Sequence, residues 1–127
     1  MREPLTVKRM LLAVSVVAVL VALAGVGSAH AASSTTCDVR KDGRKLGTTY
    51  VTSLKVSHVS CTAAKRLVKA FHACRRASGG VKGRCVKRVS GYHCVEQRGN
   101  TIPTQYSAKV TCTRSPRSVR FNYTQYT

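Results

Sequence analysis

The hydrophobic pattern of the chain changes character along its length. An uncharged run rich in Leu, Val and Ala covers residues 10–27. Residues 62–78 repeat apolar positions at the 3.6-residue period of a helix, whereas most of the later chain alternates apolar and polar residues as strands do. The pattern therefore predicts an apolar leader followed by a domain of one helix and several strands.

The predicted helix over residues 62–78 is amphipathic. At 100° per residue, one arc is apolar and contains Ala63, Leu67, Ala70, Phe71, Cys74 and Ala77. The opposite arc is polar and contains Lys65, Lys69, His72 and Arg76. Ser60 or Thr62 can cap the start of the helix, and Gly79-Gly80 can end it.

Strand patterns flank this helix on both sides. The expected strands cover residues 48–59, 85–89, 92–98, 106–112 and 119–123. We expect a bend or bulge at Ser90-Gly91, a loop at residues 99–103 and a turn at residues 114–117. The predicted fold class is α+β in the order β-α-β-β-β, with one helix packed on an antiparallel sheet of three or four strands.

The chain begins like an exported protein. Three basic residues precede the apolar run, and Ala29 and Ala31 are the small residues that a signal peptidase site needs. We expect residues 1–31 to be a signal peptide cleaved after Ala31, with an uncleaved signal anchor as the alternative. A lipoprotein is disfavoured because polar residues precede Cys37. The mature protein is then expected to be secreted, soluble and monomeric, with no membrane segment.

The part that follows the leader divides into two regions. Residues 32–47 are expected to form a polar, basic lead-in, either mobile or irregular, with a turn predicted at Asp42-Gly43. Residues 48–127 form a single α+β domain. A domain of this size buries only about two thirds of its unfolded surface, so we expect disulfides to contribute much of its stability.

Six cysteines fall in the mature region, which predicts three disulfides in an exported domain. A zinc site is disfavoured because no Cys-x-x-Cys pair occurs. Fifteen pairings are possible. We favour Cys74 with Cys85, across the glycine-rich link. A hairpin centred near Ile102 would place Cys94 opposite Cys112 and both beside Cys61, and we lean towards Cys61 with Cys112 and Cys37 with Cys94.

Charge narrows the classes of partner. The chain has 22 Lys and Arg against four acids. Cleavage would leave about 96 residues with a net charge of about +16, which favours contact with polyanions. The expected basic surface consists of Lys65, Arg66, Lys69, Arg75, Arg76, Lys82, Arg84, Lys87 and Arg88. Its partner would be a wall teichoic acid, a nucleic acid or an acidic polysaccharide. The alternative is that these charges are simply solvated.

Two other classes of function stay open. A secreted inhibitor or protein-binding module would suit a stapled scaffold, with the stretch around Pro103 as its loop. A small nuclease-like hydrolase would use histidines, of which His58, His72 and His93 are candidates. Glycosidase chemistry is disfavoured because Glu96 is the only acid beyond residue 42. The sequence contains neither a nucleophile elbow nor a phosphate-binding loop, and no Cys/His cluster has metal-ligand spacing. No catalytic residue, metal or cofactor is therefore predicted.

Several short motifs between residues 48 and 126 resemble those of a known group of proteins. They are Val59-Ser60-Cys61-x-x-Ala64, Gly91-Tyr92-x-Cys94, Val110-Thr111-Cys112 and Val119-x-Phe121-x-Tyr123. In these motifs the chain resembles small secreted cysteine-containing proteins of unknown function from high-GC Gram-positive bacteria. The resemblance implies an exported α+β domain and implies no activity.

Overall fold

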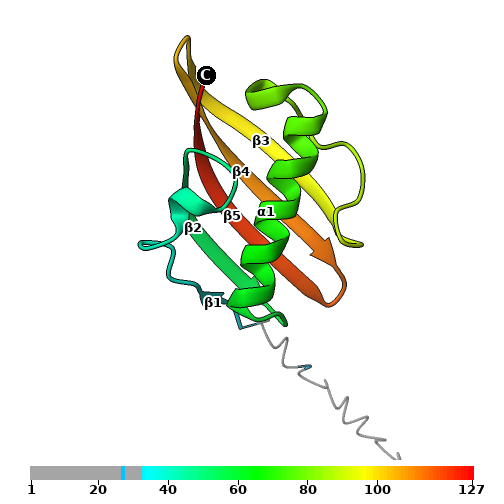
Figure 1. Ribbon diagram of the computed structural model, residues 1–127. Helices are drawn as coiled ribbons and strands as arrows, with labels where there is room; N and C mark the ends of the chain where they lie inside the picture. Colours follow the sequence, from blue (N-terminus) through cyan, green and yellow to red (C-terminus); the bar gives the residue numbers. More distant parts are fainter. Residues whose placement is uncertain (1–26, 28–32) are drawn as a thin grey trace, which may run out of the picture.

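The computed structural model describes residue 27 and residues 33–127, and Figure 1 shows a single helix crossing one face of a sheet. The predicted signal peptide and its cleavage site lie outside the described residues. The elements are β1 (Thr35–Thr36), the 3-10 turn η1 (Gly43–Lys45), β2 (Tyr50–Ser57), α1 (Cys61–Ala77), the 3-10 turn η2 (Gly80–Lys82), β3 (His93–Ile102), β4 (Gln105–Arg114) and β5 (Arg117–Tyr126). The α+β prediction is confirmed.

The sheet is antiparallel and has the strand order β1-β2-β5-β4-β3. It has five strands, one more than expected, because the lead-in adds the two-residue strand β1 to the edge of β2. The expected strand at 85–89 is absent from the described chain, where this segment contributes only the isolated bridge between Val89 and Tyr92. The predicted loop at 99–103 is shorter than expected, since β3 continues to Ile102.

Local signals at the ends of the elements are confirmed. The Ser60 hydroxyl accepts a hydrogen bond of 3.1 Å from the Ala63 N–H at the start of α1. The predicted bend at Ser90-Gly91 is a tight turn in which both residues have positive φ, 48° and 81°. The lead-in is irregular and well packed: it buries Leu46 and bonds through the Cys37 N–H to the Leu54 carbonyl.

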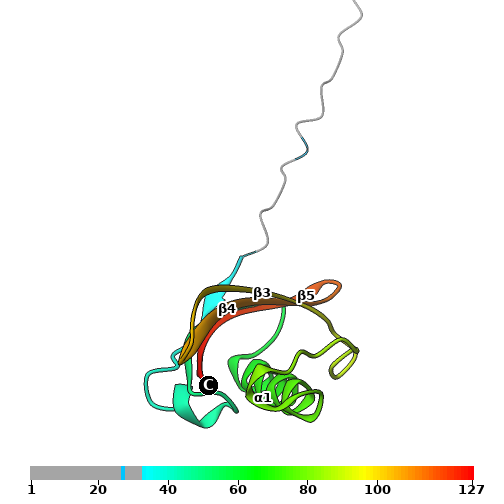
Figure 2. The same ribbon diagram turned by 90° about the horizontal axis from the view of Figure 1, so that it is seen from above.

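Seen from above, the sheet curves around α1 (Figure 2). The core lies between them, where Phe71 of the helix meets Phe121 of β5 edge to face, with 5.5 Å between the ring centroids. Within the described part of the chain, no helix is long and apolar enough to cross a membrane.

The buried side of α1 differs from the predicted arc. The helix buries Ala64, Leu67, Val68, Phe71, His72, Cys74 and Arg75. This stripe is displaced by roughly 80° around the axis from the alanine-containing arc that the sequence suggested. The expectation that His72 faces solvent is wrong, because the lead-in covers that flank. A Cβ on Gly47 would lie 2.9 Å from the His72 Cβ.

Three disulfides staple the domain, as expected, and one of the three predicted pairings is correct. The bridges join Cys37 to Cys61, Cys74 to Cys85, and Cys94 to Cys112. The pairings of Cys61 with Cys112 and Cys37 with Cys94 are therefore wrong. Three disulfides are consistent with an extracellular protein.

Strand order explains the correction. The lead-in lies against β2, at one edge of the sheet, whereas Cys94 belongs to β3 at the other edge. Cys37 therefore meets the start of α1 instead, at Cys61. The prediction that Cys94 lies opposite Cys112 is confirmed by the strand register, and these two cysteines bond directly to each other.

Candidate anion-binding surface

The basic residues predicted as one contiguous surface lie in three places around α1. A first groove, of about 390 Å³, runs between α1 and η1. Its cationic residues are Lys45, Lys65, Arg66 and Lys69. On the helical wheel Arg76 continues the exposed face of Arg66 and Lys69 towards the end of the helix. We call Lys45, Lys65, Arg66, Lys69 and Arg76 the helix patch.

The other predicted cations lie beyond this patch. Lys87 and Arg88 line a second groove, of about 370 Å³, on the opposite flank of α1, where they face Ala70, Ala73 and Ala77. Lys82 and Arg84 line a third site, a cleft of about 650 Å³ that also contains Arg98 of β3. Separate grooves on separate flanks mean that the predicted surface is divided, although each part is cationic.

All three acids of the described chain are already engaged by cations. Asp38 pairs with Arg40 at 2.9 Å, and this hydrogen-bonded guanidinium lowers the pKa of the exposed Asp38 carboxyl to about 2. Asp42 accepts from Lys65 Nζ at 2.7 Å, which ties η1 to α1.

The third acid, Glu96, is nearly buried and pairs with Arg84 at 3.3 Å and with Arg98 at 3.2 Å. The cations of the helix patch other than Lys65 therefore have no carboxylate partner among the described residues.

Arg75 must be removed from the predicted binding surface, because it is completely buried. Its guanidinium donates to three neutral oxygens: the Val81 carbonyl at 2.6 Å, the Tyr106 hydroxyl at 2.8 Å and Gln125 Oε1 at 2.8 Å. It also lies 5.1 Å from the centroid of the Tyr123 ring. The charge of Arg75 is thus used inside the fold, where it joins the end of α1 to η2, β4 and β5.

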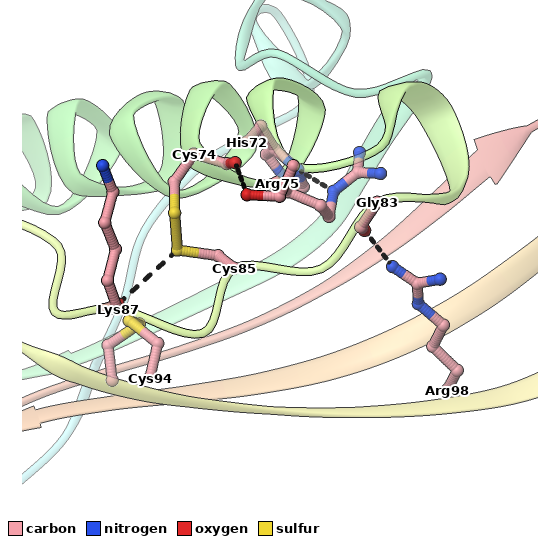
Figure 3. The surroundings of a disulfide bond; sticks show 10 residues. His72, Cys74, Arg75, Gly83, Cys85, Lys87, Cys94 and Arg98 are labelled. Atoms are coloured by element: carbon pink, nitrogen blue, oxygen red, sulfur yellow. Dashed lines mark hydrogen bonds between the residues drawn. A yellow bond between two sulfur atoms is a disulfide. The ribbon is translucent and has the colours of Figure 1, made fainter.

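His72 completes this internal network. Its Nδ1 accepts a hydrogen bond of 3.1 Å from Arg75 Nε, so the ring proton must lie on Nε2, which is buried and has no partner among the described residues. Burial, reinforced by the nearby charges of Arg75 and Arg76, lowers the pKa of His72 to about 3. Figure 3 shows His72 and Arg75 beside the bridge between Cys74 and Cys85.

A second polar group links the sheet to the segment after the helix. Arg98 donates from Nη1 to the Lys82 carbonyl at 2.9 Å and from Nη2 to the Gly83 carbonyl, the latter contact visible in Figure 3. The Tyr123 hydroxyl donates to Glu96. Burial first, and this hydrogen bond second, raise the pKa of Tyr123. Glu96, the only acid in the described strands, is therefore shared between Arg84 and Arg98 and balances one of their two charges.

The candidate histidines of a nuclease do not converge. His72 lies on the buried side of α1, against β5, and His93 is exposed at the start of β3. His58 is exposed just after β2, at a positive φ of 56°. The sheet order separates the end of β2 from β3 by two intervening strands. No two of these three side chains therefore share a site.

Two basic residues of the grooves were not among the predicted ones. Lys45 lies in the lead-in, which the sequence marked only as polar and basic, and the ion pair between Asp42 and Lys65 brings it to the helix. Arg98 follows Glu96 by two residues, and this spacing places both on the same face of β3. The alternation of β3 was the one signal that could have identified it.

Four tyrosines fall into two classes by their burial. Tyr92, Tyr106 and Tyr123 are buried, whereas Tyr126 is half exposed and packs edge to face on Tyr50 at 5.5 Å. Packing is therefore the role of the first three.

Comparisons of this chain with protein-family models, with curated proteins and with solved structures find no match.

Proposed function

We propose that the protein is a secreted module that binds an anionic polymer through the helix patch. The observation that carries the proposal is the arrangement of Arg66, Lys69 and Arg76 on the exposed face of α1, with no carboxylate paired to them among the described residues. Acids three or four residues from such cations would pair with them and stabilise the helix. Helix α1 contains no acid, and among the described residues only Lys65 of the patch has a carboxylate partner, Asp42.

The geometry favours a polymer over a single small ion. From Lys65 to Arg76 the helix rises about 16 Å, at about 1.5 Å per residue. Cations spread over this length match several successive charges of a linear chain. Lys45 adds a further cation across the groove. Binding would be driven mainly by the release of counterions, so it should weaken steeply with salt.

The experiment compares two triple variants that remove equal charge from different faces. R66Q/K69Q/R76Q removes the exposed helix cations. K55Q/K109Q/R120Q removes three exposed cations from the opposite face of the sheet, where Lys55 and Arg120 are directly paired in register. Binding to fluorescent polyphosphate is measured by anisotropy over a series of salt concentrations, with the oxidised mature chain.

We expect the helix variant to bind with a weaker salt dependence. Its slope of log K against log salt should become less negative by about one unit for each lost contact, two to three in all. The sheet variant should leave the slope within about half a unit of the wild type. Equal losses in the two variants would show that only net charge matters, and the proposal would be wrong.

A further inference from the structure

The cleft that contains Lys82, Arg84 and Arg98 has the composition of a small-molecule site, and it is separate from the helix patch. It opens at the end of the sheet where β3 turns into β4. Its volume of about 650 Å³ falls within the range of pockets that hold small organic ligands. Its lining combines three cations, Lys82, Arg84 and Arg98, with the apolar residues Ile102 and Pro103.

Among the cations of the cleft, Arg98 is held in place by several contacts. Arg98 lies 4.3 Å from the centroid of the Tyr106 ring and is held by the carbonyls of Lys82 and Gly83. Its Nε is buried and has no acceptor among the described residues. The segment that carries Lys82 and Arg84 is therefore anchored on a guanidinium whose donors are not all used.

The charge of the cleft is not balanced by protein. Glu96 is the one carboxylate that pairs with these cations among the described side chains, and it is shared by Arg84 and Arg98 while also accepting from Tyr123. The Arg84 side chain is 56% exposed, and Lys82 is exposed as well. Lys82 and Arg84 can thus meet an incoming anion without leaving the fold.

The apolar side is unusual for a hairpin tip. Ile102 is 52% exposed, and Pro103 beside it is exposed too. Large apolar side chains in water are a cost that a binding partner can remove. A bare inorganic anion would not contact them, but a ligand with a flat apolar body would.

We infer that this cleft binds an organic phosphate monoester with an aromatic or similarly flat body, placing the phosphate between Lys82 and Arg84 and the body against Ile102 and Pro103. A phosphate monoester carries close to two negative charges at neutral pH, which matches two exposed cations. Arginine and lysine are both common phosphate ligands, the first through paired donors and the second as a point charge. The inference does not rest on the proposed function of the helix patch.

The test uses the oxidised mature chain and three probes in calorimetric or NMR titrations: phenyl phosphate, inorganic phosphate and phenol. We expect phenyl phosphate to bind at least tenfold more tightly than either of the others. Equal affinity for phenyl phosphate and inorganic phosphate would overturn the inference, because it would leave the apolar wall without a role.

Variants locate the site. K82Q should weaken phenyl phosphate binding by about tenfold, since it removes one of two charge contacts. I102S should weaken phenyl phosphate by a similar factor and leave inorganic phosphate unchanged. The matched control K109Q removes an exposed cation of the outer sheet face and should change neither. A loss in K109Q equal to that in K82Q would refute the site.

The two proposals fail separately. R66Q/K69Q/R76Q should bind phenyl phosphate like the wild type, because none of its changes touches the cleft. Loss of phenyl phosphate binding in that variant would assign the phosphate to the helix patch and overturn the inference about the cleft. Loss of polyphosphate binding there, with phenyl phosphate intact, is the result expected if both proposals hold.

Discussion

Between pH 7 and pH 5, acid should destabilise this protein through His72. The imidazole is buried between α1 and the sheet, and its Nδ1 must stay unprotonated to accept from Arg75 Nε. Its pKa is about 3 in the folded protein against 6.5 for an unperturbed histidine. Well above pH 6.5 the ring is neutral in both the folded and the unfolded protein, so keeping it neutral in the fold costs no stability. Below pH 6.5 the unfolded chain takes up a proton that the folded protein refuses, so stability falls as the pH falls.

The magnitude follows from this difference in proton uptake. Each pH unit between the two pKa values removes about 1.4 kcal/mol from the free energy of unfolding. From pH 7 to pH 5 the loss is about 2 kcal/mol, which corresponds to a fall in Tm of roughly 10 °C for a domain of this size. The pKa of Asp38, lowered to about 2, places any contribution of that carboxyl below pH 4, outside this window.

The assay is urea unfolding followed by circular dichroism at pH 7, 6 and 5, with the disulfides intact. His72→Gln keeps an oxygen that can accept from Arg75 and has no proton to gain, so its stability should be flat over this range although lower at pH 7. His93→Gln is the matched control, because His93 is exposed on β3, and it should keep the wild-type slope. The reasoning is refuted if the wild type is equally stable at pH 7 and pH 5, or if His72→Gln retains the slope.

Two further predictions concern close packing and covalent linkage. Gly83→Ala should lower the free energy of unfolding by on the order of 2 kcal/mol or more, because the added Cβ would be driven into the Arg75 carbonyl oxygen. In the same urea titration the control Gly99→Ala, whose Cβ would meet nothing within 4 Å, should change it by less than about 0.5 kcal/mol. A non-reducing peptide map should recover Cys37 linked to Cys61, and the double variant C37S/C61S should lose about 3 kcal/mol by removing a cross-link between residues 24 positions apart. A peptide linking Cys61 to Cys112 would contradict the structure.

Short-range signals predicted most of the fold. The Ser60 cap, the positive-φ turn at Ser90-Gly91 and the alternation in β4 and β5 each depend on a few neighbouring residues, and each is found where the sequence indicates it. The hairpin register also placed Cys94 opposite Cys112 correctly. The strand expected at 85–89 is wrong: Val86 is exposed instead of packed, and the segment makes only the bridge between Val89 and Tyr92.

Long-range packing explains what the sequence could not predict. The helical wheel assigns the alanine-rich arc of α1 to the core. Which side of the helix is buried depends instead on the segments that pack against it: the sheet curves around α1, and the lead-in covers its other flank (Figure 2). Two polar residues, His72 and Arg75, therefore lie inside. Only the tertiary positions of Tyr106 and Gln125, 31 and 50 residues beyond Arg75, supply the oxygens that make burial of its charge tolerable.

The candidate sites show the same division. Composition predicts that the protein surface is cationic, and it cannot say which cations are already neutralised. Arg98 and Lys45 enter the clefts because ion pairs made by Glu96 and Asp42 position the segments around them. Arg75 does not belong to the surface, because it is buried and its guanidinium donates to oxygens inside the fold. In a protein with so few acids, the placement of three carboxylates decides which of its many cations stay free to meet an anion.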